Sequence, residues 1–355
     1  MSASDSKKLI TDRKIRFALV GFGRIAMNHL NALKLHSDDC KLVDVCDIDP
    51  LARDRARVNT EAKVHPSLDA MLEVTTADCV ILTTPSGLHA SQAIQIAMNG
   101  KHIVTEKPMA TRWEDGLRMV EVADEAGVKL FVVKQNRLNR TLQLLKSAID
   151  ENRFGRIYSV AINVFWTRPQ EYYDSAQWRG TWEYDGGAFM NQASHYVDLL
   201  DWLVGPVESV SAFTATLGRN IEVEDSGVAA LCWRSGTLGT VNVTMLTYPK
   251  NFEGSITILG ERGTVRVGGV AVNEILHWEF DEVHAQDADV KNASYETASV
   301  YGNGHEHYYR NVIASLYGKA DPETDGREGL KSLELLIAMY RSAQEGRQVA
   351  LPLEH

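Results

Sequence analysis

The sequence has few cysteines, no long apolar run and no apolar leader. Only four cysteines occur among 355 residues, and none forms a Cys-x-x-Cys pair. This scarcity favours free thiols in a reducing compartment. No stretch approaches the length of a membrane span. The polar start from Met1 to Lys14 lacks the apolar core of a signal peptide. We therefore expect a cytoplasmic protein with no membrane partner.

Positive charge is also in deficit. Lys and Arg number 37 against 47 Asp and Glu, which gives a formal net charge of −10 at pH 7. An acidic chain gains nothing from a polyphosphate, so we expect no nucleic-acid partner. A small anionic substrate remains open, because a local group of arginines can act against the overall charge. The length itself predicts two domains.

Strand and helix signals alternate in the first part of the chain. The predicted strands are Ile15–Val20, Lys41–Asp47, Cys79–Thr83, His102–Thr105 and Lys129–Val133. The predicted helices are Ala26–Leu35, Leu51–Val58, Ala90–Asn99 and Trp113–Ala126. Alternation at these lengths predicts a parallel sheet covered by helices on both faces. We expect a Rossmann domain over residues 1–140.

The pattern changes after about Arg140. The later strand signals are Ile157–Trp166, Val207–Thr216, Gly227–Trp233, Gly236–Thr244, Gly254–Leu259, Thr264–Val267 and Ile275–Phe280. The later helix signals are Leu142–Glu151, about Phe189–Leu203, His307–Tyr317 and Gly329–Gln344. Short turns between consecutive strands favour antiparallel pairing. Residues 141–355 are thus expected to form an α+β domain with a large, mostly antiparallel open sheet.

A glycine-rich loop separates the first strand from the first helix. Its sequence, Gly21-Phe22-Gly23-Arg24-Ile25-Ala26, fits G-x-G-x-x-A. Gly21 permits the tight turn, Gly23 lets the backbone approach a pyrophosphate, and the helix N-terminus favours negative charge. Alone, the motif also fits a tight strand-to-helix turn that binds nothing.

An acid at the end of the second strand makes dinucleotide binding the better interpretation. Asp47 stands where a carboxylate accepts both ribose hydroxyls of an adenosine. The same charge would repel a 2′-phosphate, so we expect NAD rather than NADP. Arg53 lies nearby in the sequence and can weaken this discrimination.

Further polar residues follow the later strands, where ligands of open parallel sheets bind. Ser86 and His89 follow Thr84 in the turn after one strand, and Lys107 follows the next. Ser86 also fits a helix cap, His89 fits a packing residue, and a lysine is most often a solvated surface residue. The position of Lys107 at the strand end favours a functional role. Pro108 is a candidate for a cis peptide bond.

The helix predicted near Phe189–Leu203 carries a histidine. Asn191, His195 and Asp198 are spaced to share a face that differs from the apolar one. A lone histidine is more often structural. An amide one turn before it and a carboxylate nearly one turn after it make His195 a better candidate for a general base.

Together these motifs resemble the glucose-fructose oxidoreductase/inositol dehydrogenase (Gfo/Idh/MocA) family along nearly the whole chain. The matching features are Gly21-x-Gly23, Glu106-Lys107-Pro108, Gln135-Asn136-Arg137, and Gly186-Gly187 followed by His195-x-x-Asp198. The resemblance implies hydride transfer from a carbinol of a sugar or cyclitol to NAD. It implies that His195 accepts the hydroxyl proton and Lys107 hydrogen-bonds the oxygen, or the reverse. The expected cofactor-binding residues are Gly21, Phe22, Gly23, Arg24, Ile25, Asp47, Thr84, Ser86, His89, Glu106, Lys107 and Gln135.

A narrower resemblance concerns bacterial UDP-N-acetylglucosaminuronate 3-dehydrogenases. It rests on Arg168–Asp174, Trp178–Trp182 and Met190–His195. Enzymes of that kind oxidise C3′ of the sugar in the biosynthesis of diacetamido uronic acids of O-antigen lipopolysaccharide. The expected substrate-binding residues are Lys107, Arg137, Asn139, Arg168, Tyr172, Tyr173, Arg179, Asn191, Gln192 and His195. Many relatives carry aspartate at the position of Asn191. Because an amide cannot share a proton with His195 as a carboxylate would, we expect Asn191 to bind substrate rather than to relay protons. The aromatic residues also fit core or subunit-interface packing.

Other functions remain open at this point. The same fold can oxidise a free sugar, inositol or glycoside, serve as a non-catalytic NAD-sensing regulator, or hydrolyse a glycoside by transient oxidation. His305-Glu306-His307 has metal-ligand spacing, but no further ligand cluster is evident, so we expect no metal. The exposed strands of the second domain predict a homodimer or homotetramer.

Overall fold

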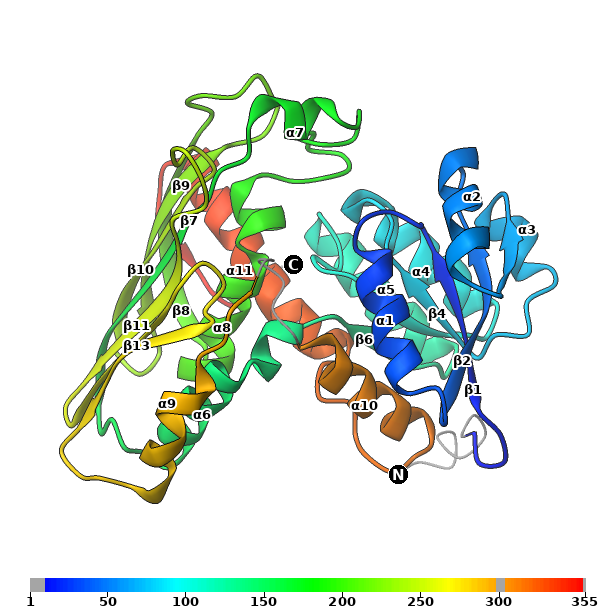
Figure 1. The fold of residues 1–355 in the computed structure, drawn as a ribbon. Coiled ribbons are helices and arrows are strands. Elements are labelled where there is room, and N and C mark those ends of the chain that lie inside the picture. The colour runs from blue at the N-terminus through cyan, green and yellow to red at the C-terminus, as the bar shows by residue number, and fades with distance from the viewer. Residues whose placement is uncertain (1–9, 298–303, 354–355) are drawn as a thin grey trace. The chain divides into compact units, whose positions relative to one another are not determined.

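The chain divides into two compact units, which are described separately. The computed structural model describes residues 10–297 and 304–353. Among these, residues 10–133 and 305–330 form the first unit, and the remainder form the second (Figure 1). The segments Met1–Leu9 and Glu354–His355 lie outside the described residues, as do residues 298–303.

The first unit is built on a parallel sheet, as the sequence predicts. Its strands are β1 (Ile15–Val20), β2 (Cys40–Cys46), β3 (Lys63–His65), β4 (Cys79–Leu82), β5 (His102–Thr105) and β6 (Leu130–Val132). Their order across the sheet is β3-β2-β1-β4-β5-β6, and all pairs are parallel. This is the doubly wound arrangement, in which strands are added first on one side of β1 and then on the other, and ligands bind beyond the strand ends at this switch point.

Helices connect these strands. They are α1 (Ala26–Leu35), α2 (Pro50–Asn59), α3 (Leu68–Leu72), α4 (His89–Met98) and α5 (Trp113–Glu125), with a 3₁₀ turn over Ser86–Leu88. Asp49 caps α2 by accepting hydrogen bonds from the backbone of Leu51 and Ala52, as an N-cap aspartate does. Ser86 lies inside the 3₁₀ turn, and the N-cap of α4 is Leu88, so the alternative role of Ser86 as a helix cap is wrong.

A late segment of the chain completes the first unit. Helix α10 (His305–Leu316) packs on α1, and the ring of its Tyr309 meets that of Phe17 on β1 edge to face, with centroids 5.8 Å apart. The Val132 amide also donates to the Thr324 carbonyl at 2.8 Å. Residues 305–330 therefore do not belong to the second unit, where a boundary near residue 140 had placed them, because their apolar face is buried against α1.

The second unit contains the mostly antiparallel sheet. Its described strands are β7 (Ile157–Phe165), β8 (Val207–Ala215), β9 (Ser226–Trp233), β10 (Leu238–Thr244), β11 (Glu253–Gly260), β12 (Gly263–Gly268), β13 (Glu274–Phe280) and β14 (Val349–Ala350). They are ordered β13-β12-β11-β7-β10-β9-β8-β14. Only the β7–β10 pair is parallel among these described strands. The strands alternate buried and exposed residues, which is typical of a sheet with one covered face.

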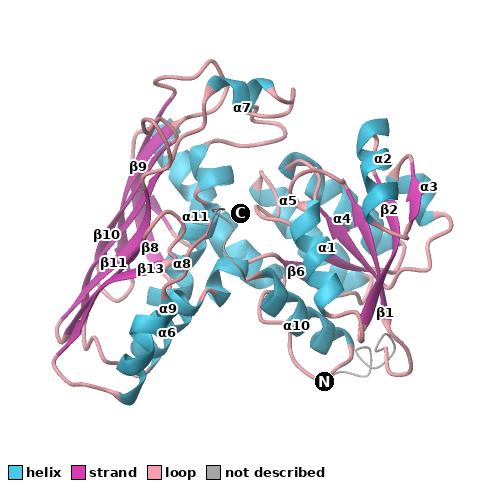
Figure 2. Cartoon of the chain, in the orientation of Figure 1, coloured by secondary structure: helices cyan, strands magenta, loops and turns pink. Residues whose placement is uncertain are grey.

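The second unit also contains helices. They are α6 (Arg140–Asp150), α7 (Gln170–Asp174), α8 (Ser194–Val204), α9 (Val290–Ala293) and α11 (Gly326–Glu345), whose first residues belong to the other unit. Figures 1 and 2 show α6 and α8 beside the same face of the sheet. No described helix is long and apolar enough to cross a bilayer.

The helix carrying His195 begins later than predicted. Residues Ala188–Gln192 form a π-helical turn, and α8 starts only at Ser194. The Glu224 carboxylate accepts the Phe189 amide at 2.9 Å and so takes up a backbone donor at the start of this turn. Asn191 and His195 therefore do not lie on one continuous α-helix, and the predicted common face with α-helical spacing is wrong for Asn191.

Candidate functional site

The glycine loop has the geometry that a phosphate-binding turn requires. Gly21 has φ +88°, and a Cβ there would lie 2.9 Å from the carbonyl oxygen of Thr83. A Cβ at Gly23 would meet no protein atom within 4 Å, and Gly23 and Arg24 are exposed. The loop thus presents open backbone just before α1, which fits the pyrophosphate of a dinucleotide.

Asp47 is tied to the glycine loop. Its Oδ2 accepts the Phe22 amide at 2.6 Å, and its Oδ1 accepts the Asp49 amide at 2.8 Å. The carboxylate stays partly exposed, so lone pairs remain for ribose hydroxyls. Arg53 donates to the carbonyl oxygens of Asp47 and Ile48, both at 2.9 Å. Its guanidinium is thus anchored to the backbone beside the acid.

The turn after β4 is braced by a histidine. His89 is buried, with Nε2 2.9 Å from the Thr84 carbonyl and Nδ1 2.9 Å from the Pro108 carbonyl. Burial lowers the pKa of His89, so the neutral ring donates to only one of the two at a time. His89 therefore connects two loops at the strand ends, a packing role that the sequence left open. The Thr84 hydroxyl donates to Gln92 at 2.6 Å.

Lys107 follows β5 in a partly exposed position. Its peptide bond to Pro108 is cis, and its backbone amide donates to Oε2 of Glu106 at 3.1 Å. Glu106 itself is buried, with Oε1 2.9 Å from Nε2 of His29. Hydrogen bonds to this carboxylate hold the pKa of Glu106 well below its usual range although burial acts to raise it. The carboxylate is thus occupied by protein donors, and its contact with a cofactor stays a prediction.

His195 lies in the second unit beside an amide. Its Nε2 is 3.0 Å from Nε2 of Gln135, and both side chains are buried. If Gln135 donates, the proton of the neutral imidazole sits on Nδ1, and Nε2 presents a lone pair. That is the state a general base needs before it removes a hydroxyl proton.

Two neighbouring asparagines have unsatisfied side chains. Neither side-chain atom of Asn136 or Asn139 has a hydrogen-bond partner among the described residues, and both are buried. Asn139 stands at the N-cap of α6 without capping it. Buried amides without partners are uncommon in native proteins, so these two fit a polar ligand. Asn139 was expected in the substrate set; Asn136 was not, although it stands in the same motif.

Asp198 is engaged by two cations that the spacing did not reveal. Its Oδ1 lies 2.9 Å from Nζ of Lys134, and its Oδ2 accepts Nε of Arg137 at 2.7 Å. Burial acts to raise the pKa of Asp198, but the two cations hold it well below its usual range. Arg137 also donates Nη2 to Oδ1 at 2.7 Å. The Arg137 guanidinium is thus already paired with Asp198 through two hydrogen bonds, which weighs against its expected role in binding a substrate anion.

Four predicted substrate residues meet in the second unit, and we call them the arginine–tyrosine cluster: Arg168, Tyr172, Arg179 and Gln192. Arg179 donates to the Tyr172 hydroxyl at 2.6 Å, and Gln192 donates to it at 3.3 Å. Both guanidinium carbons lie over the Tyr172 ring, at 4.3 Å for Arg179 and 5.5 Å for Arg168. Neither arginine pairs with a carboxylate of a described residue, and both are half-buried.

The remaining predicted residues divide between site and core. Asn191 is partly exposed and donates to Asp185, an acid that the sequence analysis did not select although it immediately precedes Gly186. Tyr173 is buried against Gly180 and the Tyr172 ring. For Tyr173 the packing alternative is therefore the better interpretation.

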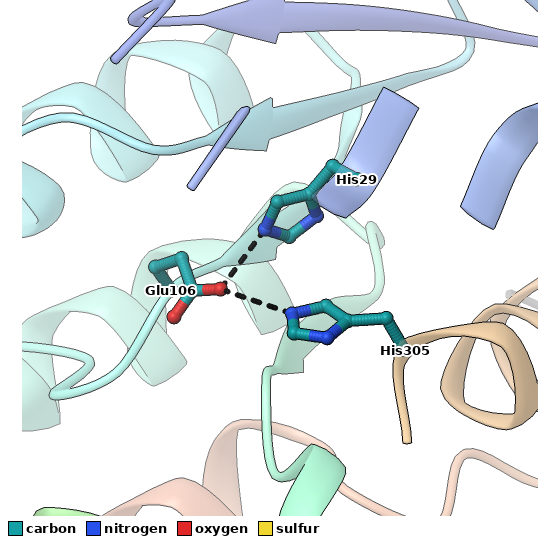
Figure 3. A group of neighbouring side chains, drawn as sticks. All are labelled: His29, Glu106 and His305. Atoms are coloured by element: carbon teal, nitrogen blue, oxygen red, sulfur yellow. Dashed lines mark hydrogen bonds and ion pairs between the residues drawn. The ribbon is translucent and has the colours of Figure 1, made fainter. Parts of the chain in front are cut away.

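A group of potential metal ligands does exist, contrary to the sequence analysis. One ligand atom each from His29, Glu106 and His305 lies within 4.8 Å of the others, and all three side chains are buried (Figure 3). His307, the other histidine of the H-x-H motif, is exposed. The two histidines of the motif therefore do not face one site, since only His305 faces Glu106.

These features define a class: an oxidoreductase with a dinucleotide-binding Rossmann unit and a second, sheet-based unit. The chain belongs to the Gfo/Idh/MocA oxidoreductase family. The family's NAD-binding Rossmann fold matches residues 15–134, and its C-terminal alpha/beta domain matches residues 146–351.

Solved structures of two dehydrogenases are very similar to this chain. The WlbA dehydrogenase of Chromobacterium violaceum is 69% identical, with a TM-score of 0.94 over 98% of this chain and 99% of the other. The WlbA dehydrogenase of Bordetella pertussis is 66% identical, with a TM-score of 0.95 over 97% and 100%. Both were solved in complex with NADH and UDP-GlcNAcA. More distantly, D-apiose dehydrogenase of Paraburkholderia graminis is 26% identical over 99% of this chain and 95% of its own length.

Proposed function

We propose that this protein is an NAD-dependent dehydrogenase that oxidises the C3′ hydroxyl of UDP-N-acetylglucosaminuronic acid to the 3-keto sugar. The product would serve biosynthesis of the diacetamido uronic acids of O-antigen. Support comes from the two WlbA dehydrogenases, which bind NADH and UDP-GlcNAcA and share 66% and 69% of their sequence with this chain.

The residues of the first unit fit NAD as the cofactor. Open backbone at Gly23 accommodates the pyrophosphate, and the partly exposed carboxylate of Asp47 binds the adenosine ribose while disfavouring a 2′-phosphate. NAD supplies the hydride acceptor at C4 of its nicotinamide. The chain's own residues bind and orient the two reactants.

One observation carries the choice of substrate. The arginine–tyrosine cluster presents two half-buried guanidinium groups that no described carboxylate neutralises. Such groups favour a bound anion, because a planar guanidinium binds phosphate or carboxylate through two hydrogen bonds. UDP-N-acetylglucosaminuronic acid carries both kinds of anion, whereas inositol and free neutral sugars carry neither.

Proton transfer is assigned to His195 and stabilisation of the oxygen to Lys107. The substrate hydroxyl would replace Gln135 at Nε2 of His195, which then accepts the proton. The Lys107 ammonium would hydrogen-bond the oxygen and stabilise its developing negative charge. Asn136 and Asn139, which lack partners, would bind polar groups of the substrate.

The direct test combines NAD, UDP-N-acetylglucosaminuronic acid and the purified protein, and follows absorbance of the reduced cofactor. A 2-oxoacid is added in parallel, in case the bound cofactor is reoxidised in place. Turnover of myo-inositol or a free sugar, with none of the nucleotide sugar, would contradict the proposal. Cofactor binding without turnover of any substrate would favour a regulator, and release of a free sugar without net NADH would favour a glycosidase.

Two substitutions test the assignment of roles. Lys107→Met and His195→Asn are expected to abolish turnover while leaving NAD affinity nearly unchanged, because both residues act on the hydroxyl rather than on the cofactor's phosphates. Tryptophan fluorescence titration measures cofactor affinity, and initial rates measure turnover. Retention of most of the wild-type kcat by either variant would contradict the role assigned to that residue.

We also infer a homo-oligomer, a dimer or tetramer, in the cytoplasm. The open face of the second unit's sheet carries Phe213, Val228 and Leu238 at 74%, 47% and 60% exposure. Phe213 and Val228 are cross-strand partners, so their side chains lie side by side. A second copy of this chain would bury such a face. Free thiols at all four cysteines are consistent with a reducing compartment.

A further inference from the structure

The first unit contains a chain of polar side chains that ends at the backbone of Lys107. His29 on α1 lies between two partners, with Nδ1 2.7 Å from the Tyr309 hydroxyl and Nε2 2.9 Å from Oε1 of Glu106. The other oxygen of Glu106 accepts the amide of Lys107 at 3.1 Å. Three separate segments, α1, the end of β5 and α10, are thus joined in one network, of which Figure 3 shows the contact between His29 and Glu106.

The hydrogen bonds of this network have one consistent direction. Burial lowers the pKa of His29, so its ring is neutral and carries one proton. An ionised Glu106 can only accept, which places that proton on Nε2 and leaves Nδ1 to accept from Tyr309. Every polar atom of His29 is then satisfied, and the buried carboxylate has two donors, His29 and the Lys107 amide.

A second buried histidine–carboxylate pair in the same sheet provides a control for a purely structural role. His65 and Asp44 are 2.7 Å apart, both buried, and the Thr75 hydroxyl also donates to Asp44 at 2.6 Å. That pair joins β2 to β3, three strands away from β5. If a buried pair were only a structural brace, both pairs would behave alike when disrupted.

We propose that His29 is a positioning residue for catalysis: by donating to Glu106, it fixes the carboxylate that holds the backbone of Lys107 in place. This inference rests on the proposed role of Lys107 in the reaction. Without His29, the carboxylate keeps its burial but loses a donor, so it becomes easier to protonate. A protonated Glu106 turns its acceptor oxygen away or binds Lys107 more weakly, and the lysine loses its fixed position.

Other groups that face Glu106 must be considered for its titration. The titratable groups near it are His29, His89, Lys107, His305, Tyr308 and Tyr309. His305 has Nε2 3.7 Å from Oε1 of Glu106, too far for a hydrogen bond, and that nitrogen has no partner among the described residues. At these distances His29 makes a hydrogen bond to Glu106 and His305 does not.

The same three ligand atoms also suit a divalent cation. A cation would need the lone pair of Nε2 of His29, which the hydrogen bond to Glu106 excludes. Metal analysis of the purified full-length protein separates the two cases. A stoichiometric metal ion that is lost from His305→Phe would overturn the positioning role.

The kinetic test compares three substitutions, His29→Leu, His29→Gln and His65→Leu, by kcat against pH. His29→Leu is expected to lower kcat roughly 10- to 100-fold, since small displacements of a catalytic group cost this much. Its acid limb should move up by about one pH unit or more. The Gln variant, whose amide can still donate to Glu106, should recover most of the rate and the wild-type limb.

His65→Leu is the matched control, expected to lower thermal stability without moving the pH profile. Identical profiles for the His29→Leu and His65→Leu variants would overturn the inference. Should His29→Leu fail to fold, His29→Met decides: its side chain keeps a similar length but cannot donate to Glu106, and an unchanged acid limb counts against the proposal. An inactive wild type would contradict the proposed function itself, and an active Lys107→Met would contradict the role of Lys107 on which this inference rests. If the wild type is active and Lys107→Met is inactive, a negative result of the His29 comparison contradicts this inference alone.

Discussion

The surroundings of Arg179 favour an anionic ligand. It is half-buried, stacks over Tyr172 and Trp178 with its guanidinium carbon 4.3 and 4.4 Å from the ring centroids, and pairs with no described carboxylate. Partial burial of a cation without a counter-ion is costly for the free protein, so an anionic substrate bound here would relieve a cost that already exists. The same argument applies to Arg168.

Arg179→Met is therefore expected to weaken binding of the nucleotide sugar more than chemistry. Loss of a charge-assisted contact should raise KM roughly 10- to 100-fold, with kcat changed much less, because the contact is made in both ground and transition states. Arg118→Met, at an exposed arginine on α5, is the control. Steady-state kinetics with UDP-N-acetylglucosaminuronic acid measures both, and an equal fall in kcat and kcat/KM would contradict the role.

Glu224 makes the second unit sensitive to pH. Burial raises its pKa from 4.5 to about 7, and its Oε2 has no hydrogen-bond partner among the described residues. Glu224 ionises at a lower pH in the unfolded chain than in the folded protein. Its contribution to the free energy of unfolding is therefore fully present below about pH 4.5 and falls as the pH rises toward 7. The group then costs the folded state on the order of 3 kcal/mol at high pH.

Glu224→Gln should remove that dependence. Its free energy of unfolding relative to wild type is expected to rise between about pH 5 and pH 8 and to level off above. Glu279→Gln, at a side chain 76% exposed, should show no such trend. Urea titrations across this range provide the measurement; a flat difference for Glu224→Gln would mean that the carboxylate ionises normally.

At the scale of elements, the two glycines of the glycine loop allow effects on stability to be distinguished from effects on NAD binding. A side chain at Gly21 is strained by its φ of +88° and would contact the Thr83 carbonyl, whereas one at Gly23 meets no protein atom. Gly21→Ala should lower both stability, by about 1–2 kcal/mol or more, and NAD affinity. Gly23→Ala should leave the melting temperature unchanged and still weaken NAD binding, since its methyl group occupies the path of the pyrophosphate.

Thermal melts with and without NAD distinguish the two variants. A Gly23→Ala protein that is stabilised by NAD as strongly as wild type would show that the cofactor does not approach this glycine. The comparison also tests the assignment of the loop independently of any catalytic assay.

The elements that sequence predicts well are those with strong local signals. β1, α1 and β5 begin and end at the predicted residues, because an apolar run ends at glycine or a periodic face ends at a polar turn. β3 has only three residues, too few for alternation to show. The π-helical turn was missed because it depends on Glu224, more than thirty residues later, accepting the Phe189 amide.

The site follows the same rule. Motifs and their positions in the sequence predict the glycine loop, Lys107 and His195 as site residues, and the cluster of Arg168, Tyr172, Arg179 and Gln192 does assemble. The partners of Asp198 lie some sixty residues away, and those of Glu106 lie on α1 and α10. Pairings across such separations leave no local pattern, so only the folded chain shows them.

At the scale of the whole molecule, the open sheet face predicts association. Phe213→Asp places a charge among exposed apolar residues of neighbouring strands and should shift the protein to a smaller oligomer, measured by light scattering. Val58→Asp, at an apolar residue of α2 that is also largely exposed, should leave the mass unchanged. A monomeric wild type, or a Phe213→Asp protein of unchanged mass, would contradict association through this face.

The packing of α10 on α1 constrains how the protein can be made. A ribosome releases all strands of the Rossmann sheet early, yet the helix that covers His29 follows only after residues 134–304 have been synthesised. Until then, the buried histidine and acid beside Lys107 lack Tyr309 and His305. The nascent nucleotide-binding unit therefore remains incomplete until the chain is almost finished, and a fragment that stops near residue 140 would be truncated within its own fold.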